Sequence, residues 1–373
     1  MTKPIKVMTV FGTRPEAIKM APIVLRMQRD TDHFTPITVV TAQHREMLDQ
    51  VLDIFKIKPD YDLNIMKPNQ TLAQITSRVL IHLDSVIDEA QPDIILVHGD
   101  TTTTFAASVS AFYHQIPLGH VEAGLRTWDK YSPYPEEMNR QLTDILSDYY
   151  FAPTSLSREN LLKQNHPDDR IFITGNTAID ALQQTVDENY HHAVLDQIDD
   201  QHRIILLTMH RRENQGEPMK RVFDAIRKVV AAYPDVELVY PVHLSPAVQK
   251  VAQAELGDVD RIHLIEPLDV VDFHNLAARS YLIMTDSGGV QEEAPSLGKP
   301  VLVLRDETER PEGVKAGTLK LVGTDPKVVT AAMETLLTDE RAYRRMADAK
   351  NPYGDGHASE RILKAIQDHQ QQL

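Results

Sequence analysis

The sequence contains no cysteine among its 373 residues, which excludes disulfides, thiolate metal sites and cysteine nucleophiles. It also has no excess of positive charge. The formal net charge is −15, so the basic surface expected of a protein that binds nucleic acid or an anionic membrane is missing. Any anionic substrate must therefore be held by a few local Arg, Lys and backbone donors.

Long apolar runs are also missing, because no stretch approaches the length that spans a bilayer. The first residues lead directly into a predicted strand that breaks at Gly12, too short and too polar for a signal peptide. Hydrophobic residues at 42% and charged residues at 25% are typical of globular proteins. We therefore expect a cytoplasmic enzyme or binding protein, not a membrane protein, with two domains of comparable size.

Several ligand-binding signatures are absent as well. No Gly-x-Gly-x-x-Gly follows the first predicted strand, and no Walker-type Gly-x-x-x-x-Gly-Lys-Ser/Thr occurs, which disfavours dinucleotide and ATP phosphate sites. His, Asp and Glu are plentiful, yet no His-Glu-x-x-His or other tight metal spacing occurs. The sequence therefore predicts no required metal and no cofactor.

What the sequence does contain is a regular alternation of short β-branched runs and helical patterns, which is typical of βαβ units and a mostly parallel sheet. The predicted strands of the first half are Ile5–Phe11, Ile37–Thr41, Ile94–His98, Leu118–Glu122, Tyr149–Pro153 and Ile171–Thr174. Those of the second half are Ile204–Met209, Val236–Val242, Ile262–Ile265, Tyr281–Thr285 and Val301–Leu304. A linking helix and domain boundary is predicted over residues 176–203. Two doubly wound domains would place their ligand crevices at the carboxyl ends of the strands, facing each other.

The most informative motif is Thr285-Asp286-Ser287-Gly288-Gly289, which follows an apolar strand and opens a predicted helix. Paired glycines let backbone N–H groups approach phosphate, and the helix N-terminus favours an anion. The glutamates just behind it repel phosphate but accept hydrogen bonds from ribose hydroxyls. The motif thus indicates a sugar nucleotide diphosphate, although it fits an ordinary strand-to-helix turn equally well.

Other unusual residues also follow predicted strands. Arg14 and Lys19 come after the first strand and could meet phosphate or sugar, although Lys19 alone fits a solvated helix position. Asp100 could be a helix N-cap, but the threonines after it already offer capping hydroxyls. Glu122 ends an apolar strand, where a carboxylate is costly unless it is paired or functional, and we favour function.

Two further segments carry charged residues at such positions. Glu136 and Arg140 could form a routine i,i+4 pair, and spacing alone favours helix capping there. His210 and Arg211 follow the first predicted strand of the second half. His210 could act as a general acid or as a donor to phosphate.

Taken together, these motifs resemble the bacterial non-hydrolysing UDP-N-acetylglucosamine 2-epimerases over essentially the full length. The resemblance is carried by the following segments: Phe-Gly-Thr-Arg-Pro-Glu-Ala-Ile-Lys, Val-His-Gly-Asp-Thr-Thr-Thr-Thr, His-Val-Glu-Ala-Gly-Leu-Arg, Thr-Asp-Ser-Gly-Gly-Val-Gln-Glu-Glu-Ala-Pro and Arg-Pro-Glu-Gly. It implies a GT-B architecture within the α/β class, with two Rossmann-like doubly wound domains and the ligand crevice between them. The N-terminal domain would span residues 1–175, the UDP-binding domain 176–356, and a C-terminal helix, about 357–373, would pack back on the first domain.

The resemblance also implies a homodimer that interconverts UDP-GlcNAc and UDP-ManNAc by elimination and re-addition of UDP through 2-acetamidoglucal, without NAD or metal, for cell-envelope polysaccharides. It places Asp100, Glu122, Glu136 and His210 among the catalytic residues. It places Arg14, Lys19, Phe273, Ser287, Gly288, Gly289, Glu293 and Arg310 at substrate-binding positions, with Glu293 on ribose and Phe273 near uracil. A second UDP-GlcNAc would bind as an activator at Gln43, His44, Gln70, Glu136, Arg211 and His243. Leu268 falls where some relatives have Gln, so a uracil contact there would use backbone.

Three other functions stay open. A hydrolysing epimerase would release ManNAc and UDP, and a GT-B glycosyltransferase would need an acceptor. A sugar-nucleotide sensor would bind without turnover, but the many carboxylates argue against it, because binding an anion gains nothing from them.

Overall fold

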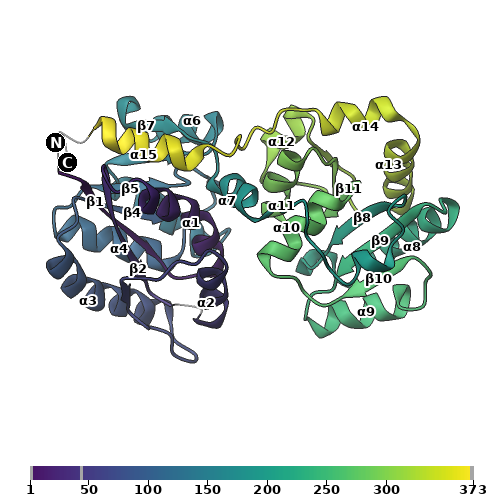
Figure 1. Cartoon of the computed structure of the whole chain (residues 1–373), viewed down its shortest axis with the longest axis horizontal. Coiled ribbons are helices and arrows are strands. Elements are labelled where there is room, and N and C mark those ends of the chain that lie inside the picture. Colours follow the sequence, from purple (N-terminus) through teal and green to yellow (C-terminus); the bar gives the residue numbers. More distant parts are fainter. Residues whose placement is uncertain (1–2, 43–44, 370–373) are drawn as a thin grey trace. The chain divides into compact units, whose positions relative to one another are not determined.

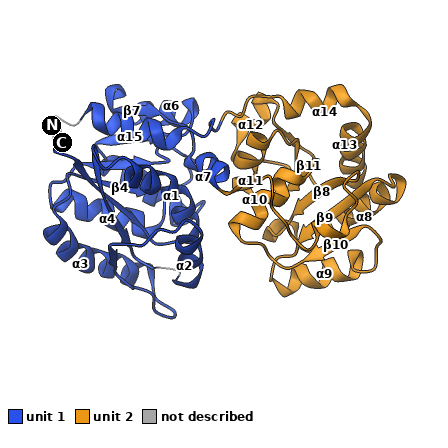
Figure 2. Ribbon diagram, viewed as in Figure 1, with its two compact units in different colours: residues 1–184, 353–373 blue, residues 185–352 orange. Residues whose placement is uncertain are grey.

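The computed structural model describes residues 3–42 and 45–369 and divides into two compact units (Figures 1 and 2). Unit 1 comprises Met1–Gln184 together with Tyr353–Leu373, and unit 2 comprises Thr185–Pro352. Each unit contains one parallel sheet with helices on both faces. The predicted α/β class with two doubly wound domains is confirmed. Among the described helices, none is both long and apolar enough to cross a membrane.

The sheet of unit 1 has seven strands in the order β3-β2-β1-β4-β5-β6-β7. Its strands are β1 (Ile5–Phe11), β2 (Phe34–Val40), β3 (Tyr61–Asp62), β4 (Ile94–His98), β5 (Leu118–Val121), β6 (Tyr149–Ala152) and β7 (Ile171–Ile173). Its helices are α1 (Arg14–Arg29), α2 (Arg45–Ile54), α3 (Leu72–Ala90), α4 (Thr102–Tyr113), α5 (Glu136–Leu146), α6 (Ser155–Lys163), α7 (Thr177–Thr185) and α15 (Ala358–Asp368), with a 3₁₀ turn η1 (Asp168–Arg170).

The sheet of unit 2 has six strands in the order β10-β9-β8-β11-β12-β13. Its strands are β8 (Arg203–Thr208), β9 (Val236–Pro241), β10 (Ile262–Ile265), β11 (Leu282–Thr285), β12 (Val301–Val303) and β13 (Leu319–Leu321). Its helices are α8 (Glu217–Ala232), α9 (Pro246–Leu256), α10 (Val270–Arg279), α11 (Gly288–Glu293), α12 (Pro311–Ala316), α13 (Pro326–Thr338) and α14 (Glu340–Ala347), with 3₁₀ turns η2 (Leu195–Gln197), η3 (Arg212–Asn214) and η4 (Ala294–Leu297).

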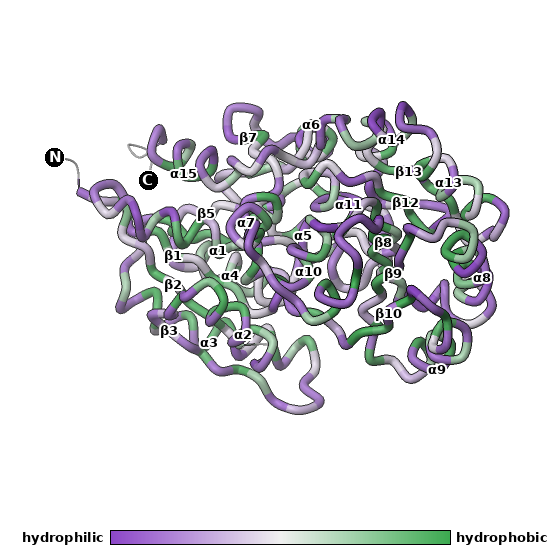
Figure 3. Tube along the Cα trace, turned by 45° about the vertical axis from the view of Figure 1, so that its right-hand side comes forward, coloured by the Kyte–Doolittle hydropathy of each residue, from purple (hydrophilic) through white to green (hydrophobic). Residues whose placement is uncertain are grey.

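The strands form where apolar residues can be buried on both faces of the sheet. Successive residues of a strand point to opposite faces, so Val7 of β1 packs with helices α1 and α2 while Met8 packs with α3 and α4. Both side chains are fully buried. A parallel sheet covered in this way needs nearly continuous apolar strands, and Figure 3 shows the hydrophobic segments concentrated in them.

The C-terminal helix α15 belongs to unit 1, although the segment that precedes it in the sequence belongs to unit 2 (Figures 1 and 2). Ile362 and Ile366 are buried in the same hydrophobic cluster as Met20 of α1. An ion pair of 3.0 Å between Arg26 and Glu360 joins the two helices at the surface. Apolar burial therefore holds the end of the chain on the first sheet.

Two strands were not predicted from the sequence. Strand β3 has only two residues, and β13 carries the exposed Lys320 between two leucines. Both lie at a sheet edge, where pairing on one side only leaves a weak apolar pattern. The predicted linking helix over residues 176–203 is also shorter than expected, since α7 ends at Thr185 and only the 3₁₀ turn η2 follows before β8.

The strand order places ligand chemistry at one point of each sheet. The order reverses between β1 and β4 in unit 1 and between β8 and β11 in unit 2. In doubly wound folds, ligands bind beyond the carboxyl ends of the strands at such a reversal. The loops after these four strands are therefore the first places to look for a site.

Candidate active site

In unit 1, the loop after β1 is packed closely against neighbouring loops. A Cβ atom on Gly12 would lie 1.9 Å from Thr41 Oγ1, so only glycine fits there. Arg14 begins α1 directly after this loop, as predicted, and Lys19 lies one turn further on. The loop therefore presents two basic side chains near the end of β1.

Glu16 ties this loop to the loop after β4, and the sequence analysis missed it. Its buried carboxylate accepts hydrogen bonds from the Thr13 backbone N–H (2.8 Å) and from the hydroxyls of Thr13 and Thr101 (2.7 Å each). Burial raises the pKa of Glu16, although these hydrogen bonds oppose the effect. The signal in the sequence was the Thr-x-x-Glu spacing of a capping box.

Asp100 lies in the loop after β4 but does not cap the following helix. The hydroxyl of Thr101 accepts from the backbone N–H of Thr104 (3.1 Å) and is the cap. Asp100 pairs instead with Arg140, with 2.7 Å between Oδ2 and Nη2. Burial raises the pKa of Asp100 to about 6; Arg140 opposes the shift, and the charges of Glu122 and Glu136 add to it. A carboxyl with such a pKa can gain or lose a proton near neutral pH.

Glu122 follows β5 in an unusual backbone conformation, with φ at +69°. A non-glycine residue rarely adopts this region, and such strain is concentrated at functional sites. Its carboxylate forms an ion pair with Lys19 and accepts a hydrogen bond from Asn176 Nδ2 (2.9 Å). The acidic residue Glu122 and the basic residue Lys19, which belong to two separate sequence motifs, are thus in direct contact. Lys19 is therefore not simply a solvated helix residue.

His98 lies beside Glu122 at the end of β4, with 3.8 Å between Nε2 and Glu122 Oε2. Burial lowers the pKa of His98 to about 3, so the ring stays neutral. Neither ring nitrogen has a hydrogen-bond partner within the described ranges. The neutral His98 ring therefore packs beside the Glu122 carboxylate, whereas Lys19 forms the ion pair with it.

Glu136 is the first residue of α5, and its neighbour Glu137 holds the preceding loop through hydrogen bonds. The Glu137 carboxylate accepts from the backbone N–H groups of Thr127 (3.0 Å) and Trp128 (3.1 Å). Hydrogen bonds and Arg140 lower the pKa of Glu137, although burial by itself would raise it. The i,i+4 side-chain pair that Glu136 and Arg140 could have formed is not seen in the described structure, because Arg140 pairs with Asp100.

A buried triad of Asp144, Arg126 and His120 connects these loops to α5. Asp144 of α5 pairs with Arg126 and with His120, at 2.6 Å each, and all three side chains are inaccessible to solvent. The other ring nitrogen of His120 lies 2.7 Å from the carbonyl oxygen of Gly99, the residue before Asp100. Although burial by itself would raise it, His120 and Arg126, through their charges and hydrogen bonds, lower the pKa of Asp144.

In unit 2, the predicted phosphate motif lies as expected between β11 and the short helix α11. Ser287 is the N-cap residue, and Gly288 and Gly289 begin the helix. A Cβ atom on Gly289 would meet nothing within 4 Å, whereas one on Gly288 would lie 3.6 Å from Arg310. Arg310 itself pairs with Glu292 of the same helix. The glycine turn is therefore open on one side and has a guanidinium on the other.

His210 and Arg211 follow β8 and turn around Asp286, the buried residue after β11. The Arg211 side chain donates to the Asp286 carbonyl oxygen (2.8 Å) and to Glu309 (2.9 Å). Burial by itself would raise the pKa of Glu309, but hydrogen bonds and the cations Arg305 and Arg211 bring it to about 2. His210 is stacked on His243, with ring centroids 5.5 Å apart.

The remaining predicted residues are more scattered. Glu293 lies 3.4 Å from the ring of the buried His274, which also bonds to the Thr185 hydroxyl (2.6 Å). Phe273 packs half-buried against the hydrophobic core of unit 2. Gln70 lies in unit 1, where its amide oxygen accepts from Arg78 (2.6 Å). The predicted activator residues Gln43 and His44 lie outside the described residues.

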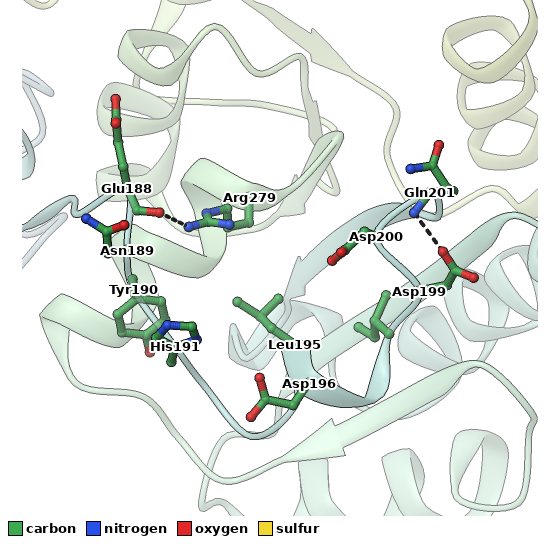
Figure 4. Close-up of a pocket in the computed structure, with 11 residues that line it drawn as sticks. Glu188, Asn189, Tyr190, His191, Leu195, Asp196, Asp199, Asp200, Gln201 and Arg279 are labelled. Atoms are coloured by element: carbon green, nitrogen blue, oxygen red, sulfur yellow. Dashed lines mark hydrogen bonds between the residues drawn. The ribbon is translucent and has the colours of Figure 1, made fainter.

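Two other features lie away from these loops. A polar recess of about 780 Å³ in unit 2 is lined by the segment before β8 and by Arg279, which donates to the Glu188 carbonyl oxygen (Figure 4). None of the predicted site residues lines it. Asp84, Asp88 and His114 of unit 1 could together hold a metal ion, but the two carboxylates are exposed and the group lies on α3 and at the end of α4. Exposed acidic groups are common on protein surfaces without a metal ion.

Known proteins match the chain over nearly its whole length. The family profile described as UDP-N-acetylglucosamine 2-epimerase matches residues 26–367. A UDP-N-acetylglucosamine 2-epimerase from Bacillus subtilis (strain 168) is 63% identical over 367 residues, which cover 98% of this chain and 96% of the relative. A crystal structure of a UDP-N-acetylglucosamine 2-epimerase is 60% identical, with a TM-score of 0.93 and coverage of 100% and 98%. The UDP-GlcNAc 2-epimerase from Neisseria meningitidis, solved with UDP-GlcNAc bound, is 51% identical, with a TM-score of 0.86 and coverage of 98% and 100%.

Proposed function

The chain belongs to the UDP-N-acetylglucosamine 2-epimerase family, and we propose that it interconverts UDP-GlcNAc and UDP-ManNAc without net hydrolysis. The observation that carries this proposal is the set of carboxylates at the end of the first sheet. Asp100 and Glu122 each face a cation, and the charges of Glu122 and Glu136 act on Asp100. A reaction that moves a proton at two faces of one carbon needs several such groups.

In the proposed first step, one carboxylate takes the proton from C2 of the sugar. The C–H electron pair forms the C1–C2 double bond, and the C1–O bond breaks with its electrons going to UDP, which leaves 2-acetamidoglucal. A carboxyl group then returns a proton to C2 from the opposite face, and UDP adds again at C1. Because the charges of Glu122 and Glu136 act on Asp100, we assign the base role to the group of these three residues and not to one member.

Basic groups of unit 1 would keep these acids in a working state. The Lys19 ammonium stabilises the ionised form of Glu122, while Arg140 opposes the effect of burial on Asp100. An acid held near pKa 6 beside an acid held ionised is the kind of pair that divides proton donation from proton removal. Arg14 is proposed to hold the substrate next to them.

Residues of unit 2 are proposed to hold UDP. The Ser287 hydroxyl and the backbone N–H groups of Gly288 and Gly289 would donate hydrogen bonds to the diphosphate, with Arg310 and His210 as further donors. Glu293 would accept hydrogen bonds from the ribose hydroxyls, and Phe273 would lie near uracil. Holding UDP firmly favours its return to the glucal over its loss, which is the difference from a hydrolysing enzyme.

We also propose that a second UDP-GlcNAc activates the enzyme through Gln70, Arg211 and His243, with Gln43, His44 and Glu136. The Arg211 guanidinium is oriented by Asp286 and Glu309, and His243 is exposed. With pure UDP-ManNAc, the reverse reaction should then start slowly and accelerate as UDP-GlcNAc accumulates. A full initial rate without added UDP-GlcNAc would contradict the activator role.

A homodimer is proposed as the working form. Neighbouring helices α3, α4 and α5 expose large apolar side chains, including Ile81 (70% exposed), Phe112 (60%) and Ile145 (65%). Exposed apolar groups gathered on adjacent helices are typical of an interface. Light scattering during gel filtration should give twice the chain mass, and Phe112→Glu should give the monomer. A monomeric wild type would rule the dimer out.

The function is tested by incubating the protein with UDP-GlcNAc in D₂O, without added metal or NAD, and recording proton NMR spectra. We expect UDP-ManNAc with deuterium at C2 and no net free UDP. Accumulation of ManNAc and UDP would identify the hydrolysing reaction instead. An unchanged spectrum would reject the epimerase proposal and lead to acceptor screens for a glycosyltransferase.

A further inference from the structure

Asp286 is a buried carboxylate at the strand-order reversal of unit 2, directly after β11. It forms no ion pair with Lys or Arg in the described part of the chain. Three N–H donors converge on its Oδ2 atom: the backbone N–H of His210 (3.0 Å), that of Arg211 (2.9 Å) and the Asn214 side-chain amide (3.0 Å). The carboxylate is therefore fixed in one orientation by the loop that carries His210.

The second oxygen of Asp286 has a different environment. Oδ1 is buried and has no regular hydrogen-bond partner within residues 3–42 and 45–369. Buried polar atoms in proteins are nearly always paired, so an orphan atom needs an explanation. The atom that it faces is Nδ1 of His210, at 3.3 Å. Anchoring through Oδ2 thus aims Oδ1 at one ring nitrogen.

This arrangement favours one position for the proton on the His210 ring. A carboxylate oxygen only accepts, so a proton on the facing Nδ1 is stabilised, whereas Nε2 is turned away from Asp286. The His210 side chain is 41% exposed, so Nε2 can reach a ligand. The stacked His243 ring is arranged the opposite way, because its Nδ1 accepts from the Ser245 backbone N–H (3.1 Å).

We propose that Asp286 is the positioning residue of His210: it holds the Nδ1–H tautomer, stabilises the imidazolium, and directs Nε2–H toward the β-phosphate of the departing UDP. The last part rests on the proposed function, whereas the tautomer does not. The same arrangement of carboxylate and histidine serves catalysis on unrelated folds. Around the ring, burial, His243 and Arg211 disfavour the imidazolium, and Asp286 is the anionic group that opposes them.

A purely structural role would not require a carboxylate. The three N–H donors on Oδ2 could all be satisfied by the amide oxygen of asparagine, since that oxygen accepts in the same place. Only the contact with His210 needs the second oxygen. Asp286→Asn would put an N–H group against Nδ1 and favour the opposite tautomer. This substitution therefore separates the two roles.

The test is NMR of the full-length protein with labelled histidine, using His210→Gln to assign the signals. In the wild type, neutral His210 should carry its proton on Nδ1. In Asp286→Asn the proton should move to Nε2, and the pKa of His210 should fall by about one unit, the size expected for removing a neighbouring opposite charge. Asp325→Asn, which alters an exposed helix cap of unit 2, is the control and should change neither.

An Nε2–H tautomer in the wild type, or the same tautomer and pKa in Asp286→Asn, would overturn the proposal. These spectra need no substrate, so they remain decisive even if the proposed reaction is wrong. The wild-type tautomer also decides the question should Asp286→Asn fail to fold.

Kinetics test the link to catalysis. With UDP-GlcNAc, Asp286→Asn should lower kcat about 10- to 100-fold while KM changes less than about threefold. Activity that needs the imidazolium is lost as pH rises through its pKa, so the alkaline limb of the profile should move to lower pH. In the His210→Gln background, adding Asp286→Asn should lower kcat by less than about threefold. The effects of residues that act through one another are not additive. Equal and additive losses in both backgrounds would show a merely structural residue.

Discussion

Removing the charge of Asp144 tests whether the buried triad supports the first half of the site. In Asp144→Asn, the Arg126 guanidinium stays buried, at 0% exposure, without its anion, and the buried His120 ring loses its carboxylate partner. Breaking a buried ion pair by removing one partner costs about 3–5 kcal/mol, because the other charge is left uncompensated. The expected loss is therefore a large part of the stability of unit 1.

The matched control is Asp168→Asn in the same unit. Asp168 pairs with Arg158 at 2.5 Å, nearly the same distance, but the two side chains are 60% and 34% exposed. Solvent screens such a pair, so its removal should cost less than about 1 kcal/mol. The two variants differ mainly in burial, which isolates the cause.

The assay is urea unfolding followed by tryptophan fluorescence. The sequence has a single tryptophan, Trp128, which lies in unit 1, so the signal reports that unit even if the two units unfold separately. With a urea slope of about 3 kcal/mol per molar for a domain of this size, the Asp144→Asn midpoint should fall by roughly 1–1.7 M. The control should move by less than about 0.3 M.

The dependence on pH has a definite sign. Because the pKa of Asp144 is lowered in the folded state, its stabilisation is present above the ordinary aspartate value of 3.8 and is lost as pH falls through the lowered pKa. The Asp144 contribution to the difference between the wild type and Asp144→Asn should therefore shrink as pH falls below about 4. Equal midpoint shifts for Asp144→Asn and Asp168→Asn would refute the reasoning.

Three further predictions concern the site and the backbone. Glu122→Gln should reduce exchange of the C2 proton in D₂O about 10²- to 10⁴-fold, and full exchange in the folded variant would exclude Glu122 from the chemistry. In the wild type, kcat/KM should fall as pH drops through about 6, because protonation of Asp100 removes its pairing with Arg140. The less active Asp100→Asn variant should not show this acidic limb of the pH profile. An unchanged limb in the variant would assign it to another group. Gly124→Ala would place Cβ 2.3 Å from the Ser157 carbonyl oxygen at a φ of +84°. It should therefore destabilise more than Gly317→Ala, a position with a similar φ of +82° but with nothing within 4 Å, where the substitution should cost about 1 kcal/mol. Similar losses in thermal unfolding would show that the contact at Gly124 relaxes.

Much of the fold was predictable because it depends on local patterns. The buried strands β4 and β8 are short β-branched runs, and helices follow them at regular intervals. The same patterns located the loops at the strand ends, where Asp100, Glu122 and His210 lie. The short edge strands β3 and β13 were missed, because a strand paired on one side needs few apolar residues.

The pairings within the site could not be read in this way. Lys19 meets Glu122 from 103 positions away, and Asp286 reaches the backbone of His210 from 76 positions away. The spacing allowed Arg140 to pair within its own helix, but Arg140 pairs with Asp100. Each of these contacts depends on which strands are neighbours in the sheet, and local periodicity carries no information on strand order.

The sequence by itself determined the α/β class, the positions of the strand ends and the kinds of residue that follow them, because burial and backbone preference act over a few neighbouring residues. The tertiary structure alone decided which carboxylate faces which cation, that Glu122 is held at a positive φ, and that Asp286 is aimed at His210. These features arise because parallel strands bring distant loops to one edge of the sheet, where charges that are far apart in the sequence must neutralise one another to be buried.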